Sequence, residues 1–66
     1  MIQTAHFELE DAEEEREAYV NVRARRNLVA LAVSLKNSGD VEVFVTSKIA
    51  REIAQALAAA ASAADT

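Results

Sequence analysis

The chain has 66 residues, with 7 Lys or Arg against 11 Asp or Glu, which gives a net charge of −4. A domain this small buries only about 60% of the surface of its unfolded chain, which excludes most enzymes that need a deep, enclosed site. The chain has no Cys and one Gly, which excludes disulfide scaffolds, thiolate metal sites and a Gly-rich phosphate-binding loop.

The sequence has no segment that points to a membrane or to export. The longest run without a charged residue, residues 53–64, is shorter than the roughly 20 apolar residues that a membrane-spanning helix needs. The first six residues have neither the basic region nor the apolar core of a signal peptide. We therefore expect a cytoplasmic protein with no membrane contact. Five Arg against two Lys, and 15 Ala, suggest a GC-rich bacterial or phage genome.

The N-terminal part predicts a weak strand and an acidic connector. In residues 5–10, Phe7 and Leu9 alternate with polar or charged residues, which is the period of two of a half-buried strand. Residues 11–16 follow as the connector.

Residues 17–25 predict a second strand, because Val20 and Val22 alternate with polar residues. The alternative is a helix over residues 11–26, with its acids at the positive end of the helix dipole and its Arg residues at the negative end. Strict alternation, and no apolar stripe at three-four spacing, favour the strand. A single helical turn at residues 12–16, leading into the strand, satisfies both signals.

Residues 28–36 and 41–46 predict two further strands. A three-residue loop, Asn37-Ser38-Gly39, would place Gly39 where a left-handed backbone is needed. Between the second and third strands, the sequence allows either a two-residue loop, Arg26-Asn27, or a four-residue loop in the same register. These loops pair Leu35 with Val41, Val33 with Val43 and Leu31 with Val45 in one hairpin, and Ala24 with Val29, Val22 with Leu31 and Val20 with Val33 in the other.

Residues 48–64 predict an amphipathic helix capped by Thr46 or Ser47. Its apolar stripe includes Ile49, Ile53 and Leu57, and we expect it to lie across the Val-rich sheet face. The predicted fold is α+β: one small domain over residues 1–66, with an antiparallel meander of three to four strands covered on one face by a single C-terminal helix.

The opposite sheet face is the expected partner surface. Small Ala residues there, flanked by two of the three aromatic residues, would form a shallow, partly apolar patch. We expect a homodimer through this patch, since so small a core gains from association; the Ala-rich segment 58–64 is the alternative dimer contact. The patch comprises Tyr19, Asn21, Ala30, Ala32 and Phe44.

Two charged clusters are further contact candidates. Arg23, Arg25 and Arg26, with Tyr19 on the same face, could bind phosphate and stack on bases. The acidic cluster could meet the Arg cluster of another copy or a basic surface of a larger protein; it lacks the ligand pattern of a calcium loop. The acidic cluster is Glu13, Glu14 and Glu15.

No motif names a family, and no arrangement of residues predicts catalysis. His6, the only histidine, has no metal ligands at suitable spacing. We expect no enzymatic activity, no cofactor and no metal. The sequence favours a protein-interaction module, an accessory regulator or inhibitor in a bacterium or phage that binds another macromolecule. The alternative is a nucleic-acid-binding module.

Overall fold

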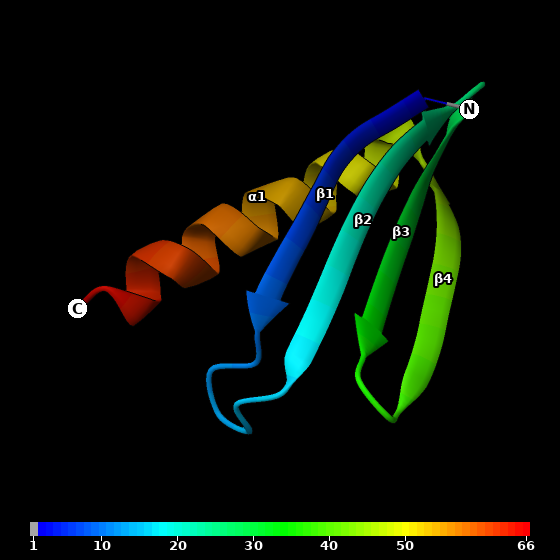
Figure 1. Cartoon of the computed structure of the whole chain (residues 1–66). Coiled ribbons are helices and arrows are strands. Elements are labelled where there is room, and N and C mark those ends of the chain that lie inside the picture. The colour runs from blue at the N-terminus through cyan, green and yellow to red at the C-terminus, as the bar shows by residue number, and fades with distance from the viewer. Residues whose placement is uncertain (1) are drawn as a thin grey trace.

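The computed structural model describes the backbone of residues 2–66 and the side chains from Thr4 onward. Four antiparallel strands in the order β1-β2-β3-β4 form one sheet, and a single helix follows them (Figure 1). The predicted α+β meander with one C-terminal helix is confirmed. The elements are β1 Ile2–Glu10, β2 Glu17–Arg25, β3 Leu28–Leu35, β4 Gly39–Thr46 and α1 Ser47–Ala64.

The β2–β3 hairpin has the predicted register. Val22 pairs with Leu31 and Val20 pairs with Val33. Asn27 takes the left-handed conformation in the two-residue turn, with φ 64°, which an Asn side chain tolerates better than most. Because β2 is extended over residues 17–25, the alternative of a helix in this segment is wrong.

The β3–β4 hairpin has the predicted faces, but its predicted register was wrong by two residues. Val33 pairs with Val41, and the loop between Leu35 and Gly39 is Lys36-Asn37-Ser38. Asn37 adopts φ 68° inside this loop, and Gly39, at φ 83°, begins β4 instead of ending the loop. A shift of two residues leaves every side chain on the same face, so alternation alone cannot detect it.

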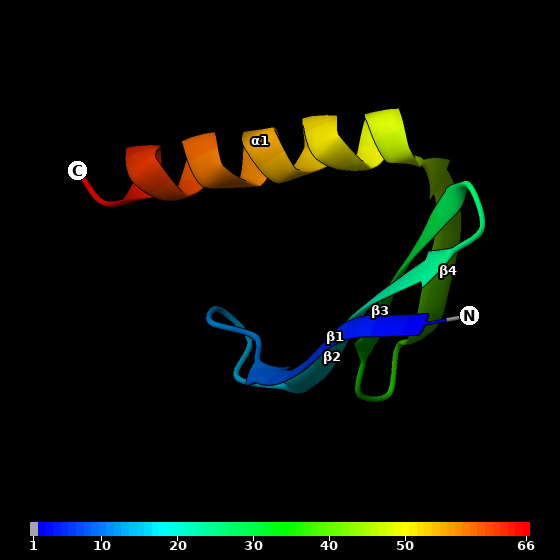
Figure 2. The same ribbon diagram turned by 90° about the horizontal axis from the view of Figure 1, so that it is seen from above.

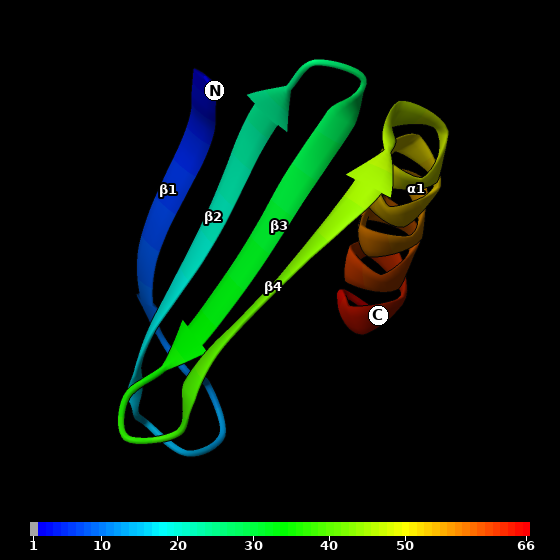
Figure 3. The ribbon, with the colours of Figure 1, turned by 90° about the vertical axis from the view of Figure 1, so that its right-hand side faces the viewer.

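The helix follows the last strand with no residue between them. Thr46 ends β4 and is also the N-cap of α1, where its Oγ1 accepts a hydrogen bond from the Ile49 N–H at 3.2 Å. The helix begins at the edge strand of the sheet (Figure 3). Within residues 2–66, no helix combines the length and apolar character needed to cross a membrane.

The two faces of the sheet differ in chemistry, because the registers align apolar residues on one side and polar residues on the other. We call them the apolar face and the polar face. The apolar face carries Phe7, Leu9, Val20, Val22, Leu31, Val33, Val41 and Val43. The polar face carries His6, Tyr19, Asn21, Arg23, Arg25, Ala30, Ala32, Ser34, Asp40, Glu42 and Phe44.

The helix lies on the side of the apolar face, but it packs against the sheet only near its start. Ala50 and Ala54 border a groove whose other wall includes Val22 and Val29. Beyond these turns the helix and the sheet diverge (Figure 2). No residue of α1 is buried, and Leu57 remains 67% exposed. The helix therefore covers one end of the apolar face and leaves the rest open.

The chain is extended for its size. Its radius of gyration is 13.1 Å, whereas a compact domain of this length has about 11 Å. Its accessible surface is 5356 Å², whereas a compact monomer of 7.1 kDa exposes about 4,100 Å². The chain thus exposes about 1,300 Å² more than a compact fold would.

Candidate functional site

On the polar face, two small residues of the interior strand β3 allow side chains of the two flanking strands to meet above it. Ala30 and Ala32 lie between longer side chains of β2 and β4. Above them, the Arg23 guanidinium forms an ion pair with the Glu42 carboxylate, joining the two strands that flank β3. This pairing neutralises one of the Arg residues that the sequence offered for phosphate binding.

A second contact of the same kind lies beside the first. The Arg25 guanidinium sits over the ring of Phe44, 5.8 Å from its centroid, which is cation–π geometry. Ala30 pairs with Arg23 on one side and Phe44 on the other, and it is 0% exposed. Although it is on the expected partner patch, Ala30 is therefore covered within the monomer.

His6 belongs to a polar cluster on β1 and β2. Its ring stacks on Tyr19 with centroids 5.7 Å apart, and its Nδ1 hydrogen-bonds the Asn21 Oδ1. Its Nε2 lies 3.8 Å from the Glu8 carboxylate. The histidine thus orders the Tyr19 and Asn21 side chains at the surface.

The polar face contains an open hollow of about 360 Å³. Of the five residues of the expected patch, Tyr19, Asn21 and Ala32 line this hollow, whereas Ala30 and Phe44 lie outside it. The rest of the lining is mostly polar or charged, and Ser34 donates a hydrogen bond to Asp40 there at 2.6 Å. The expected patch is therefore more polar than the sequence suggested, because the shifted β4 register brings Asp40 and Glu42 into it.

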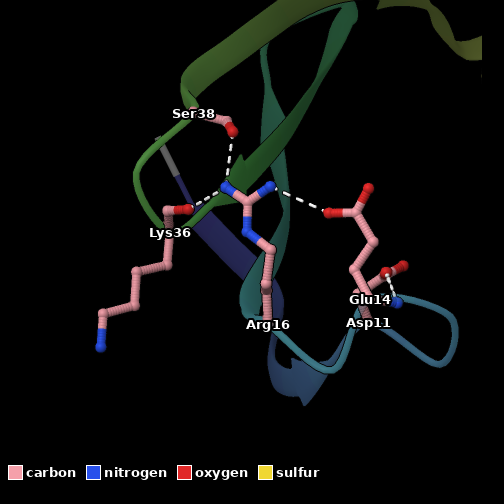
Figure 4. A network of polar contacts seen from close by, with 5 residues as sticks. All are labelled: Asp11, Glu14, Arg16, Lys36 and Ser38. Carbon is pink, nitrogen blue, oxygen red and sulfur yellow. Dashed lines mark hydrogen bonds and ion pairs between the residues drawn. The ribbon is translucent and has the colours of Figure 1, made fainter.

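The acidic connector is a turn that Arg16 ties to the β3–β4 hairpin (Figure 4). The Arg16 guanidinium contacts the Glu14 carboxylate at 2.9 Å and the Ser38 Oγ at 2.5 Å, and it donates to the Lys36 carbonyl. The Glu14 N–H donates to the Asp11 carboxylate at 2.6 Å. These contacts bridge the two loops at one end of the sheet.

The acidic cluster is exposed, and it sits at the opposite end of β2 from the Arg cluster. Glu13, Glu14 and Glu15 precede the start of β2, whereas Arg25 and Arg26 mark its other end. Glu15 has φ 58°, so the turn does not continue as a helix. No group of His, Asp or Glu side chains suited to a metal ion occurs in the part of the chain that the structure describes.

The feature that the sequence analysis missed is the open apolar face. One row across the sheet consists of Phe7, Val20, Val33 and Val41, and the residues Phe7, Val33 and Val41 are 53%, 52% and 66% exposed. The signal available in the sequence was the helix cap. Thr46 both ends β4 and caps α1, so no linker residue lies between the strand and the helix.

No family model, curated protein or solved structure matches this chain.

Proposed function

We propose that this protein is a non-enzymatic interaction module that works as a homodimer, assembled through its apolar face, and regulates or inhibits another macromolecule in a bacterium or phage. The observation that carries the proposal is the row of exposed Phe7, Val33 and Val41 beside a helix with no buried residue. Soluble monomers rarely expose a continuous apolar surface of this kind.

The surface area supports a dimer over a marginal monomer. A specific interface of standard size buries about 800 Å² on each partner. The excess surface of this chain, about 1,300 Å² over a compact monomer, is enough to supply such an interface on every copy. Only Ala18 and Ala30 are buried hydrophobic residues among those described, so most of the apolar core would form on association.

The polar face supports a second contact, with the regulated macromolecule. If the apolar face is consumed by the dimer, Tyr19, Asn21 and Ala32 remain on the outside around the polar hollow. An aromatic ring beside an amide and paired charges is typical of the mixed polar surfaces of non-obligate complexes. The His6 and Arg23 contacts hold these side chains in place before any partner arrives.

Sedimentation equilibrium over a range of protein concentrations tests the dimer. We expect a mass of twice 7.1 kDa at micromolar concentration. The unfolding temperature should rise as the protein concentration is raised, since subunit association couples to folding. A monomer at all concentrations, with a cooperative unfolding transition independent of concentration, would overturn the proposal.

A further inference from the structure

The structure points to the arrangement of that dimer: we infer that α1 of each copy packs across the apolar face of the other, so that the two chains exchange helices. This inference rests on the proposed homodimer and specifies its occupant as the helix of a second copy. The surfaces that meet are the stripe of Ile49, Ile53 and Leu57 and the row of Phe7, Val33 and Val41.

The connection between β4 and α1 prevents the helix from covering its own sheet. Connections between a strand and a helix usually have 2–6 residues, but here Thr46 ends the strand and Ser47 begins the helix. Thr46 adopts φ −71° and ψ 162°, which sets the direction in which the helix leaves. Beyond its first turns the helix diverges from its own sheet (Figure 2), so that Leu57 stays exposed and available to a neighbour.

The second half of the helix lacks the charges of an ordinary surface helix. From Ile53 to Ala64 it carries no charged residue on any side, whereas an exposed surface helix normally has a charged outer face. Its 18 residues span about 27 Å, which matches strands of eight or nine residues at about 3.3 Å per residue. One helix is thus long enough to cross the whole apolar face of a partner.

A second copy fits better than an unrelated partner because this chain carries both complementary surfaces. In a two-fold dimer each copy donates its helix and receives one, so the same contact is made twice. The exposed excess of about 1,300 Å² per chain would give a total buried area of about 2,600 Å², in the range of obligate homodimers. Association of two copies would therefore bury the surface that a monomer leaves exposed, and no third molecule is needed.

An isotope-filtered NOE experiment on the full chain tests the exchange. Chains labelled with carbon-13 and unlabelled chains are unfolded, mixed in equal amounts and refolded together. We expect NOEs between copies that join the Leu57 methyl groups to methyl groups of Val33, Val41 or Val43. The experiment requires no substitution, so it does not depend on a variant that folds.

The alternative outcomes separate the inference from the proposed function. A dimer whose NOEs between copies join the valines of two sheets, without Leu57, would overturn the helix exchange and leave the homodimer standing. A dimer whose NOEs between copies come from Tyr19 and Phe44 would overturn the helix exchange and move the interface to the polar face. A monomer would overturn both.

A matched pair of helix variants provides a second test. Leu57→Glu places a charge in the apolar stripe and should raise the dimer dissociation constant at least about tenfold. Gln55→Glu makes a similar change on the opposite side of the helix, and the dissociation constant should stay within about twofold of the original. Glu is a good helix former at both positions, and circular dichroism checks that the helix persists. Equal effects of the two substitutions would contradict the exchange.

Discussion

Thr46 caps the helix through a 3.2 Å hydrogen bond from the Ile49 N–H to its own Oγ1, while it pairs with Leu28 as the last residue of β4. One residue therefore belongs to both the sheet and the helix. A strand backbone and a helix cap both require an extended conformation at this position, so the two roles are compatible. Their combination fixes the direction of α1 relative to the sheet, and the open apolar face follows from it.

Lengthening this connection should convert the dimer into a monomer. Inserting Gly-Ser-Gly-Thr after Thr46 keeps a Thr immediately before Ser47 as the cap and adds four residues of reach. The helix can then fold back on its own sheet, and this intramolecular contact has an effective concentration in the millimolar range. Sedimentation should show a single-chain mass, while the same four residues added after Thr66 should leave the dimer unchanged. A dimer that persists with unchanged affinity would mean that the short connection does not cause the association.

A lysine on the apolar face of β4 should dissociate the dimer, whereas a lysine on the polar face of β4 should leave it intact. Val41 is 66% exposed on the apolar face, so Val41→Lys should change the stability of a monomer by no more than about 0.5 kcal/mol. In the dimer the same lysine would be buried without a partner, and we expect dissociation at micromolar concentration. Analytical ultracentrifugation provides the measurement.

Phe44→Lys is the matched control on the polar face of the same strand. It removes the contact with Arg25 but leaves the apolar face intact, so the dimer should persist. If Phe44→Lys dissociates the dimer and Val41→Lys does not, the polar face is the interface, as the sequence analysis expected.

Removing the Arg16 side chain should loosen the end of the sheet. Arg16→Ala loses the contacts with Glu14, the Lys36 carbonyl and Ser38. Because the side chain is 32% exposed, we expect a loss of about 1–2 kcal/mol in the free energy of unfolding, toward the lower end of the range for hydrogen bonds to charged groups. Urea titrations at one fixed protein concentration provide the measurement.

Arg26→Ala removes the same charge from an exposed turn and should change the free energy of unfolding by less than about 0.5 kcal/mol. Equal losses in Arg16→Ala and Arg26→Ala would show that net charge, and not the bridge between the loops, is responsible.

The nucleic-acid alternative predicts a salt-dependent interaction, and we expect none. Arg23 is paired with Glu42 and Arg25 is held against Phe44, in a chain of net charge −4. Fluorescence anisotropy of a labelled generic DNA should show no saturable binding at about 50 mM salt, where phosphate contacts are strong. Binding that weakens steeply as salt rises would favour the alternative function instead.

The strands and the helix could be predicted from the sequence because their signals are local. The alternation in residues 17–25 outweighed the helix-favouring charges at the ends of that segment. The β2–β3 register followed from the requirement that Val20 and Val22 face the same way as Leu31 and Val33. The β3–β4 register could not be predicted so well, because two pairings that differ by two residues satisfy the same alternation, and Asn37 as well as Gly39 adopts a left-handed backbone.

The surfaces were harder to predict than the elements. The sequence shows that Ile49 and Leu57 lie on one face of the helix, and that Val20 and Val33 lie on one face of the sheet. It does not show whether these two faces pack together within one molecule or between two molecules. The answer depends on the direction in which the helix leaves the strand, which the φ and ψ angles of Thr46 set. The polar face was misjudged for a related reason: the long reach of Arg23 to Glu42 across β3 depends on the register of β4.

The covered position of Ala30 has a consequence for how this chain can vary. A residue on the outer side of a sheet normally accepts many replacements, but a larger side chain at Ala30 would meet its cross-strand neighbours Arg23 and Phe44 and disturb their contacts with Glu42 and Arg25. Substitution there should be as restricted as inside a core, so that only Gly, Ala or Ser would be accepted. On its polar face the sheet thus has one fully buried position, Ala30, beside the Arg23–Glu42 and Arg25–Phe44 contacts.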